Sequence, residues 1–87
     1  MWYRRAEGVL SEISEGRAML AAPAGAEVLV LNATGTTIWE TLVGEGDPVA
    51  IARRIQEQHP AVAADAIEND VRRFLAELLA ESLVEEG

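Results

Sequence analysis

Residues 27–43 read EVLVLNATGTTIWETLV, and this stretch decides the fold. It starts with four consecutive apolar residues, a run too short for a helix and rich in branched side chains that favour a strand: Val28, Leu29, Val30 and Leu31. Asn32 follows, a residue type that often caps a helix N-terminus, and apolar residues then recur at helical spacing. The stretch therefore predicts a strand that runs directly into a helix.

Two further strands are predicted before this stretch. Residues 9–13 (VLSEI) have apolar residues at both ends, and residues 18–22 (AMLAA) follow after a turn at residues 14–16. A second turn at residues 23–25 leaves no room for a helix, because Pro and Gly interrupt the chain there. With residues 27–31 as the third strand, the pattern predicts a small antiparallel meander.

A second helix is predicted after the glycines at positions 44 and 46. Asp47 and Pro48 form the expected pair of N-cap and first helical residue. The helix should end near His59, because Pro60 disfavours helical backbone in the residue before it.

The third helix has the longest apolar stripe in the chain. Asp65 and Glu68 are spaced as a capping box with Asp65 in the cap role, and we expect the helix to end near Ser82. The stripe consists of Ile67, Val71, Phe74, Leu75, Leu78 and Leu79. The predicted fold class is α+β: a single winged helix-turn-helix-like domain over residues 1–87, with a three-stranded antiparallel sheet followed by three helices.

Composition restricts the function. The formal net charge of -8 repels nucleic acid and anionic membrane surfaces. Because the acidic residues are spread along the chain, the charge also favours solubility. No segment approaches a membrane span or a secretory signal, so we expect a cytoplasmic protein that does not contact a membrane. Without cysteine there is no thiolate nucleophile and no Cys-based metal site.

Catalytic residues are not evident. His59, the only histidine, is placed to cap a helix C-terminus, and the paired carboxylates fall on solvated helix faces. We therefore predict no catalytic residues, no metal and no cofactor. The alternative suggested by the fold outline is a winged-helix DNA-binding or transcription-associated domain. It is disfavoured because the third helix offers only Arg72 and Arg73 among several acidic residues.

Two segments resemble the PqqD family, named for a protein of pyrroloquinoline quinone (PQQ) biosynthesis. They are LVLNATGTTIWETLVGEGDPVAIARRI and AIENDVRRFLAELLAESLV, and the similarity extends over residues 9–84. Its most specific part is an LN-x-T-G corner formed by Leu31, Asn32, Thr34 and Gly35, followed by Ile38 and Trp39. Ser82 departs from the pattern, because such sequences often have Gly there. The left-handed helix cap is therefore not expected.

The resemblance implies a non-catalytic peptide chaperone that serves as a recognition element for ribosomally made, post-translationally modified peptides (RiPPs). In this family the leader segment of a precursor peptide adds as a strand to the third strand and lies against the third helix. The implied partners are the precursor peptide and a modifying enzyme, either a radical S-adenosylmethionine enzyme or a leader peptidase. An exposed strand edge suits this role, since its unpaired amides and carbonyls can bind an extended peptide.

Helical geometry suggests which side chains form the groove. At about 100° per residue, Leu75 and Leu79 lie on one flank of the apolar stripe, with Arg72 just outside them. We hypothesise that both leucines floor the groove and that Arg72 pairs with an acidic leader residue. A purely structural role in the core is an equal alternative for the two leucines and for each side chain of Val28, Leu29, Val30 and Leu31.

Three aromatic residues are harder to place. Trp39 is assigned to the core, because it lies at helical spacing beside Ile38 and Leu42. Trp2 and Tyr3 precede the matching segment, and three roles stay open for them: packing on the sheet, contact with a partner, and self-association into a homodimer.

Overall fold

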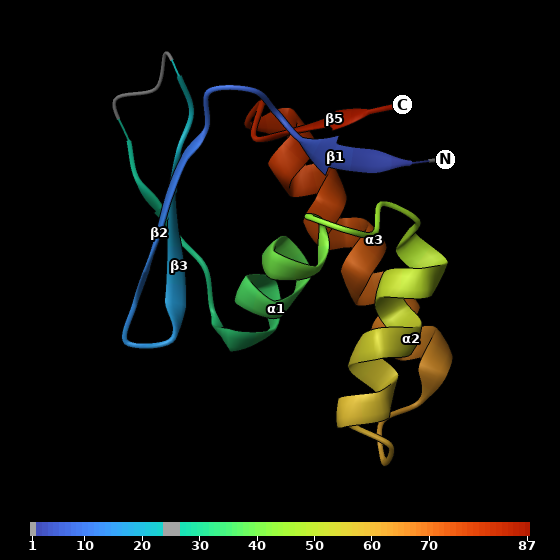
Figure 1. Ribbon diagram of the computed structural model, residues 1–87. Helices are drawn as coiled ribbons and strands as arrows, with labels where there is room; N and C mark the ends of the chain where they lie inside the picture. The colour runs from blue at the N-terminus through green and yellow to red at the C-terminus, as the bar shows by residue number, and fades with distance from the viewer. Residues whose placement is uncertain (1, 24–26) are drawn as a thin grey trace.

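The computed structural model of the protein describes residues 2–23 and 27–87, arranged as a strand hairpin beside three helices (Figure 1). Its elements are β1 Tyr3–Arg5, β2 Leu10–Ser14, β3 Arg17–Ala21, β4 Leu29–Val30, α1 Ala33–Thr41, α2 Pro48–Gln58, α3 Ala64–Ala80 and β5 Val84–Glu86. The three predicted strands and three predicted helices are all present. Of the turn predicted at residues 23–25, residues 24 and 25 lie outside the described part of the chain.

The main sheet is antiparallel with strand order β2-β3-β4. β2 and β3 form a hairpin in which Ser14 pairs with Arg17, so two residues make the turn. Both turn residues have positive φ, 53° at Glu15 and 77° at Gly16, as a type I′ turn requires. β4 is shorter than the predicted strand at residues 27–31, because only Leu29 and Val30 pair with β3.

A second, two-stranded sheet joins the ends of the described chain. β1 pairs antiparallel with β5, and Tyr3 lies opposite Glu86. Neither strand is predicted by the pattern of the sequence. Tyr3 is buried in this ribbon, whereas Trp2 is 58% exposed. Packing on a sheet is therefore the role that the structure gives to Tyr3.

The starts of α1 and α2 follow the predicted caps. The Asn32 side chain accepts a hydrogen bond from the Gly35 amide at 2.8 Å, and the Asp47 side chain accepts one from the Val49 amide at 3.1 Å. These bonds satisfy amide groups that have no partner within the helix. His59 is the C-cap residue of α2, as predicted.

The helix α3 ends at Ala80 with Glu81 as C-cap, near Ser82 as predicted, but both predictions about its caps need correction. The helix begins at Ala64 with Ala63 as N-cap, and no side chain caps it, so the capping box is absent and Asp65 lies in the first turn. At the other end Ser82 does adopt the left-handed conformation, with φ of 60°. The amides of Ser82 and Leu83 donate to the carbonyls of Leu79 and Leu78, which is the Schellman pattern.

The core lies between the helices and the inner face of the main sheet. Trp39 lies in this core and is 2% exposed, as expected. Helix α2 packs against α3. Arg5 ties β1 to this core: its guanidinium stacks over the Trp39 ring and donates two hydrogen bonds to the Trp39 carbonyl, at 2.6 and 3.2 Å. Burial lowers the pKa of Arg5, and the negative charge of Glu40 opposes this effect.

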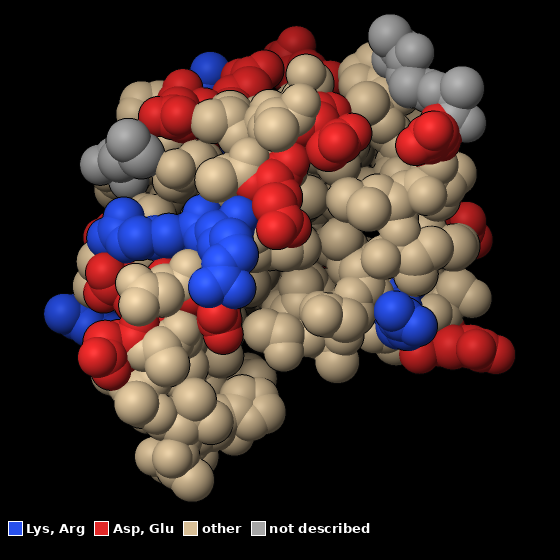
Figure 2. Space-filling model, turned by 180° about the vertical axis from the view of Figure 1, so that it is seen from behind, with Lys and Arg blue, Asp and Glu red and all other residues tan. Residues whose placement is uncertain are grey.

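Charge is unevenly placed on the surface. Figure 2 shows acidic side chains gathered along the upper part of the face seen from behind, next to a broad uncharged area. No helix among the described residues combines the length and apolar character needed to cross a bilayer.

Candidate functional site

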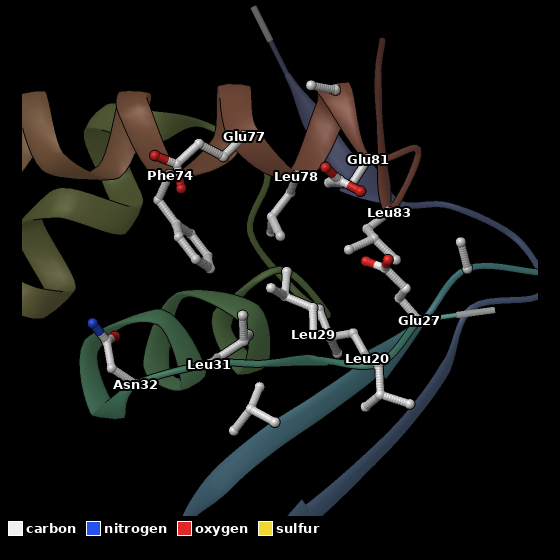
Figure 3. A pocket seen from close by; sticks show the side chains of 14 residues that line it. Leu20, Glu27, Leu29, Leu31, Asn32, Phe74, Glu77, Leu78, Glu81 and Leu83 are labelled. Carbon is white, nitrogen blue, oxygen red and sulfur yellow. The ribbon is translucent and has the colours of Figure 1, made fainter. Parts of the chain in front are cut away.

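A groove of about 890 Å³ separates β4 from the C-terminal half of α3 (Figure 3). Residues 27–32 form one wall. The other wall comes from α3 and the residues after it: Phe74, Glu77, Leu78, Ala80, Glu81 and Leu83. The groove is thus bounded by a strand on one side and a helix on the other, and it is completed by Leu20 of β3 and by Ala22, which follows that strand.

The edge of β4 that faces away from β3 carries unpaired backbone groups. The amide of Leu31 donates to the Ala18 carbonyl at 2.8 Å, so the backbone of Leu31 points toward β3. In an antiparallel ladder this direction alternates from residue to residue. The amide and carbonyl groups of Val28 and Val30 therefore point away from β3, toward the position that a further strand would occupy.

The side chains of this segment divide between two environments. Leu31 is 3% exposed and anchors the segment to the core, whereas Leu29 is 40% exposed on the same, inner side of the sheet. Val28 and Val30 project to the opposite face and are 61% and 49% exposed. Of the four apolar residues, Leu29 therefore offers the most accessible side chain toward α3.

The opposite wall presents an apolar surface from α3. Phe74 and Leu78 lie one turn apart on this face, and Leu83 follows where the chain leaves the helix. The Schellman turn at Ser82 positions Leu83, because the Leu83 amide donates to the Leu78 carbonyl. Leu83 is 2% exposed and closes this end of the groove (Figure 3).

The LN-x-T-G corner braces the groove. A Cβ atom on Gly35 would lie 3.0 Å from the Phe74 ring, so glycine leaves room for the ring to pack against α1. The hydroxyl of Thr36 accepts a hydrogen bond from the Ala18 amide at 2.9 Å, which joins the helix start to β3. These contacts fix the separation between β4 and α3.

Three residues proposed for the groove lie elsewhere. Leu75 is fully buried and is not among the residues that line this groove, so the hypothesis that it floors the groove gains no support. Leu79 packs against the core without lining the groove, and Arg72 points away and pairs with Glu68 at 3.1 Å. Of the apolar stripe, Phe74 and Leu78 line the groove, so α3 turns the flank opposite to Leu79 toward β4.

The residues that take their place had partial signals in the sequence. Phe74 and Leu78 belong to the predicted stripe, but only Leu75 and Leu79 of that stripe were proposed for the groove. Glu77 and Glu81 resembled solvated carboxylates on a helix face and Glu27 began the predicted strand, and only the fold brings the three to one groove. Within residues 2–23 and 27–87, no cluster of three or more His, Cys, Asp or Glu side chains could hold a metal ion.

Two solved structures share this architecture. TbiB1 in complex with the TbiA(beta) leader peptide is 25% identical, with a TM-score of 0.88 over 97% of this chain and 96% of that chain. The solution structure of a PqqD truncation of Methylobacterium extorquens PqqCD, described as a functional and stand-alone RiPP recognition element, has a TM-score of 0.79. It is 21% identical over 98% of this chain and 89% of that chain, a likeness of fold.

Among curated proteins, none matches the chain. Residues 17–84 match the sequence model of the family described as coenzyme PQQ synthesis protein D (PqqD). This segment contains β3, β4, all three helices and the whole groove. The chain therefore belongs to the PqqD family.

Proposed function

We propose that this chain is a recognition element that binds the leader segment of a ribosomally made precursor peptide and presents it to a modifying enzyme. The observation that carries the proposal is the edge of β4, where the backbone groups of Val28 and Val30 face a groove with an apolar opposite wall. An extended peptide satisfies these groups as an added strand, and its alternate side chains contact α3. The related TbiB1 structure contains a leader peptide, which supports the same role here.

The dimensions of the groove suit a short extended segment. At about 3.3 Å per residue, the five residues from 27 to 31 span roughly 16 Å. A leader segment of similar length would lie along them, with every second side chain directed at Phe74, Leu78 and Leu83. Leu29 supplies the apolar contact from the strand side.

The role requires no catalysis by this chain. The partner that we propose for the later step is an enzyme that modifies or cleaves the precursor, either a radical S-adenosylmethionine enzyme or a leader peptidase. DNA binding gains no support, because Arg72 and Arg73 on α3 are engaged with Glu68 and Asp70.

The test is a titration of the ¹⁵N-labelled chain with synthetic leader segments of the precursor peptides encoded in the same genome. We expect amide shifts concentrated in residues 27–32 and 74–83. Binding that leaves these amides unshifted would contradict the proposed site, and the absence of binding to every encoded leader would contradict the function.

A matched pair of variants on α3 locates the site further. Phe74→Ala removes an aromatic wall of the groove and should weaken binding about fivefold or more, because truncation of an aromatic anchor at the centre of an interface costs above about 1 kcal/mol. Arg72→Ala, on the same helix but outside the groove, should leave the affinity unchanged. Thermal unfolding followed by circular dichroism checks that both variants are folded. Equal affinities for the two would refute the assignment of the groove.

A further inference from the structure

The charges around the groove are of one sign. Three carboxylates line it, from Glu27 before β4 and from Glu77 and Glu81 on α3. Among the lining residues that the structure describes, none is Lys or Arg. A bound peptide therefore meets an apolar surface bordered by negative charge.

Two of the carboxylates share one end of the groove. Figure 3 shows Glu27 and Glu81 beside Leu83, whereas Glu77 extends toward Phe74 at the other end. Glu27 and Glu81 reach this end from opposite walls, the strand side and the helix side. A cationic side chain placed between the walls at this end would meet a carboxylate from each.

These carboxylates are not neutralised by the described part of the chain. Its ion pairs join Arg4 to Glu85, Arg72 to Glu68 and Arg73 to Asp70, and none involves Glu27, Glu77 or Glu81. The two arginines on α3 thus pair with acidic residues of their own helix, away from the groove end beside Leu83.

We propose that the groove selects a peptide with a Lys or Arg side chain between Glu27 and Glu81 and an apolar side chain against Phe74. The proposal rests on the proposed function and adds the specificity of the bound segment. Apolar contact and backbone hydrogen bonds provide affinity at either end, while the carboxylates discriminate between partners. An acidic side chain at the same place would be repelled by two like charges.

The geometry also fixes the spacing of the two peptide residues. Glu27 and Leu31 are four residues apart on the strand side, and the groove runs from Glu81 near the first to Phe74 near the second (Figure 3). Side chains of an extended peptide alternate between faces, so an even separation keeps both on the side facing α3. The basic and apolar residues of the peptide should therefore be about four positions apart.

The experiment begins with selection of phage-displayed random 12-residue peptides on the intact chain. We expect enrichment of Lys or Arg about four positions from a large apolar residue. Synthetic versions of the enriched peptides are then titrated against the ¹⁵N-labelled chain and against variants. Amide shifts in residues 27–32 and 74–83 establish that a peptide occupies the groove.

The decisive variants compare charge in the groove with charge outside it. Glu27→Gln with Glu81→Gln should weaken binding of a basic peptide about three- to tenfold, as expected for two partly solvated ion pairs. The control is Glu12→Gln with Glu57→Gln, two exposed carboxylates on β2 and α2 that do not line the groove. This control changes the net charge by the same amount. Its affinity for the basic peptide should stay within about twofold of the wild-type value, because only long-range attraction to the peptide is reduced.

The outcomes separate this inference from the proposed function. Enriched peptides that shift the groove amides but lack a basic residue would overturn the inference and leave peptide binding intact. An equal loss of affinity in the groove pair and the control pair would overturn it as well, because net charge would then explain the effect. If no selected peptide shifts the groove amides, both the inference and the proposed groove are refuted.

Discussion

Replacement of Val30 by proline tests strand addition at a single backbone group. The Val30 amide points away from β3, so proline removes no hydrogen bond of the sheet, and proline is tolerated at such edge positions. The bound peptide, however, loses the donor for one of its carbonyls. We expect Val30→Pro to remain folded and to bind a leader peptide more weakly.

The magnitude follows from one backbone hydrogen bond. Its net contribution is about 0.5–1.5 kcal/mol, and a carbonyl left unpaired between strand and helix costs about 1–3 kcal/mol. A loss near the middle of these values, about 1.5 kcal/mol, corresponds to roughly a tenfold increase in Kd. Fluorescence anisotropy of a labelled leader peptide that binds the wild type measures this change, and fluorescence of the buried Trp39 during urea unfolding reports stability.

Two controls make the result specific. Val30→Ala keeps the amide and shortens a side chain that projects away from α3, so its Kd should stay within about twofold of the wild type. Leu29→Pro removes a donor that faces β3, so it should lower stability instead. If Val30→Pro unfolds like the wild type and binds with the same Kd, the peptide does not add to this edge and the reasoning is refuted.

Three further predictions concern stability. Ser82→Gly should stabilise the protein by about 1 kcal/mol, because the left-handed conformation costs free energy for serine, whereas glycine adopts it freely. The melting temperature should rise by roughly 4–8 °C. A melting temperature that falls would contradict this. Leu75→Ala should lose about 2–5 kcal/mol in urea unfolding, well above the loss for the half-buried Leu79→Ala, whereas equal losses would argue against the buried position of Leu75. Gly46→Ala should cost about 2 kcal/mol or more, because its Cβ would overlap the carbonyl oxygen of Tyr3, and an unchanged urea midpoint would refute that close packing.

Local signals in the sequence predicted local structure well. The Asn32 and Asp47 caps form as expected, because each hydrogen bond closes within three residues. β2 and β3 lie within one residue of their predicted positions, since a two-residue turn sets their register. The PqqD resemblance rested on the same well-defined corner at Asn32 and Gly35.

Contacts distant in sequence were not predictable in the same way. β1 and β5 are three residues long, and their pairing joins positions about eighty residues apart, so neither shows an alternating pattern of its own. Ser82 was not expected to take the left-handed conformation, yet burial of Leu83 behind it holds the turn.

The flank of α3 that faces the groove was likewise not predictable from the sequence. Periodicity identifies an apolar stripe on α3, but the rotation of the helix about its axis depends on what packs on each flank. Here α2 packs against α3, and Phe74 and Leu78 line the groove beside β4. A stripe wide enough to serve a core and a groove therefore does not reveal from sequence which edge is open.

The β1–β5 ribbon also determines how this domain can be joined to others. Its two strands run antiparallel, and the Gly87 amide donates to the Trp2 carbonyl at 2.8 Å, so the first and last described residues lie side by side (Figure 1). A linker at either end would start from nearly the same point and hold the groove at a similar distance from a tethered enzyme. A short flexible tether gives an effective concentration in the millimolar range. Even a weakly held leader would then be delivered efficiently, because capture and modification would take place within one tethered assembly.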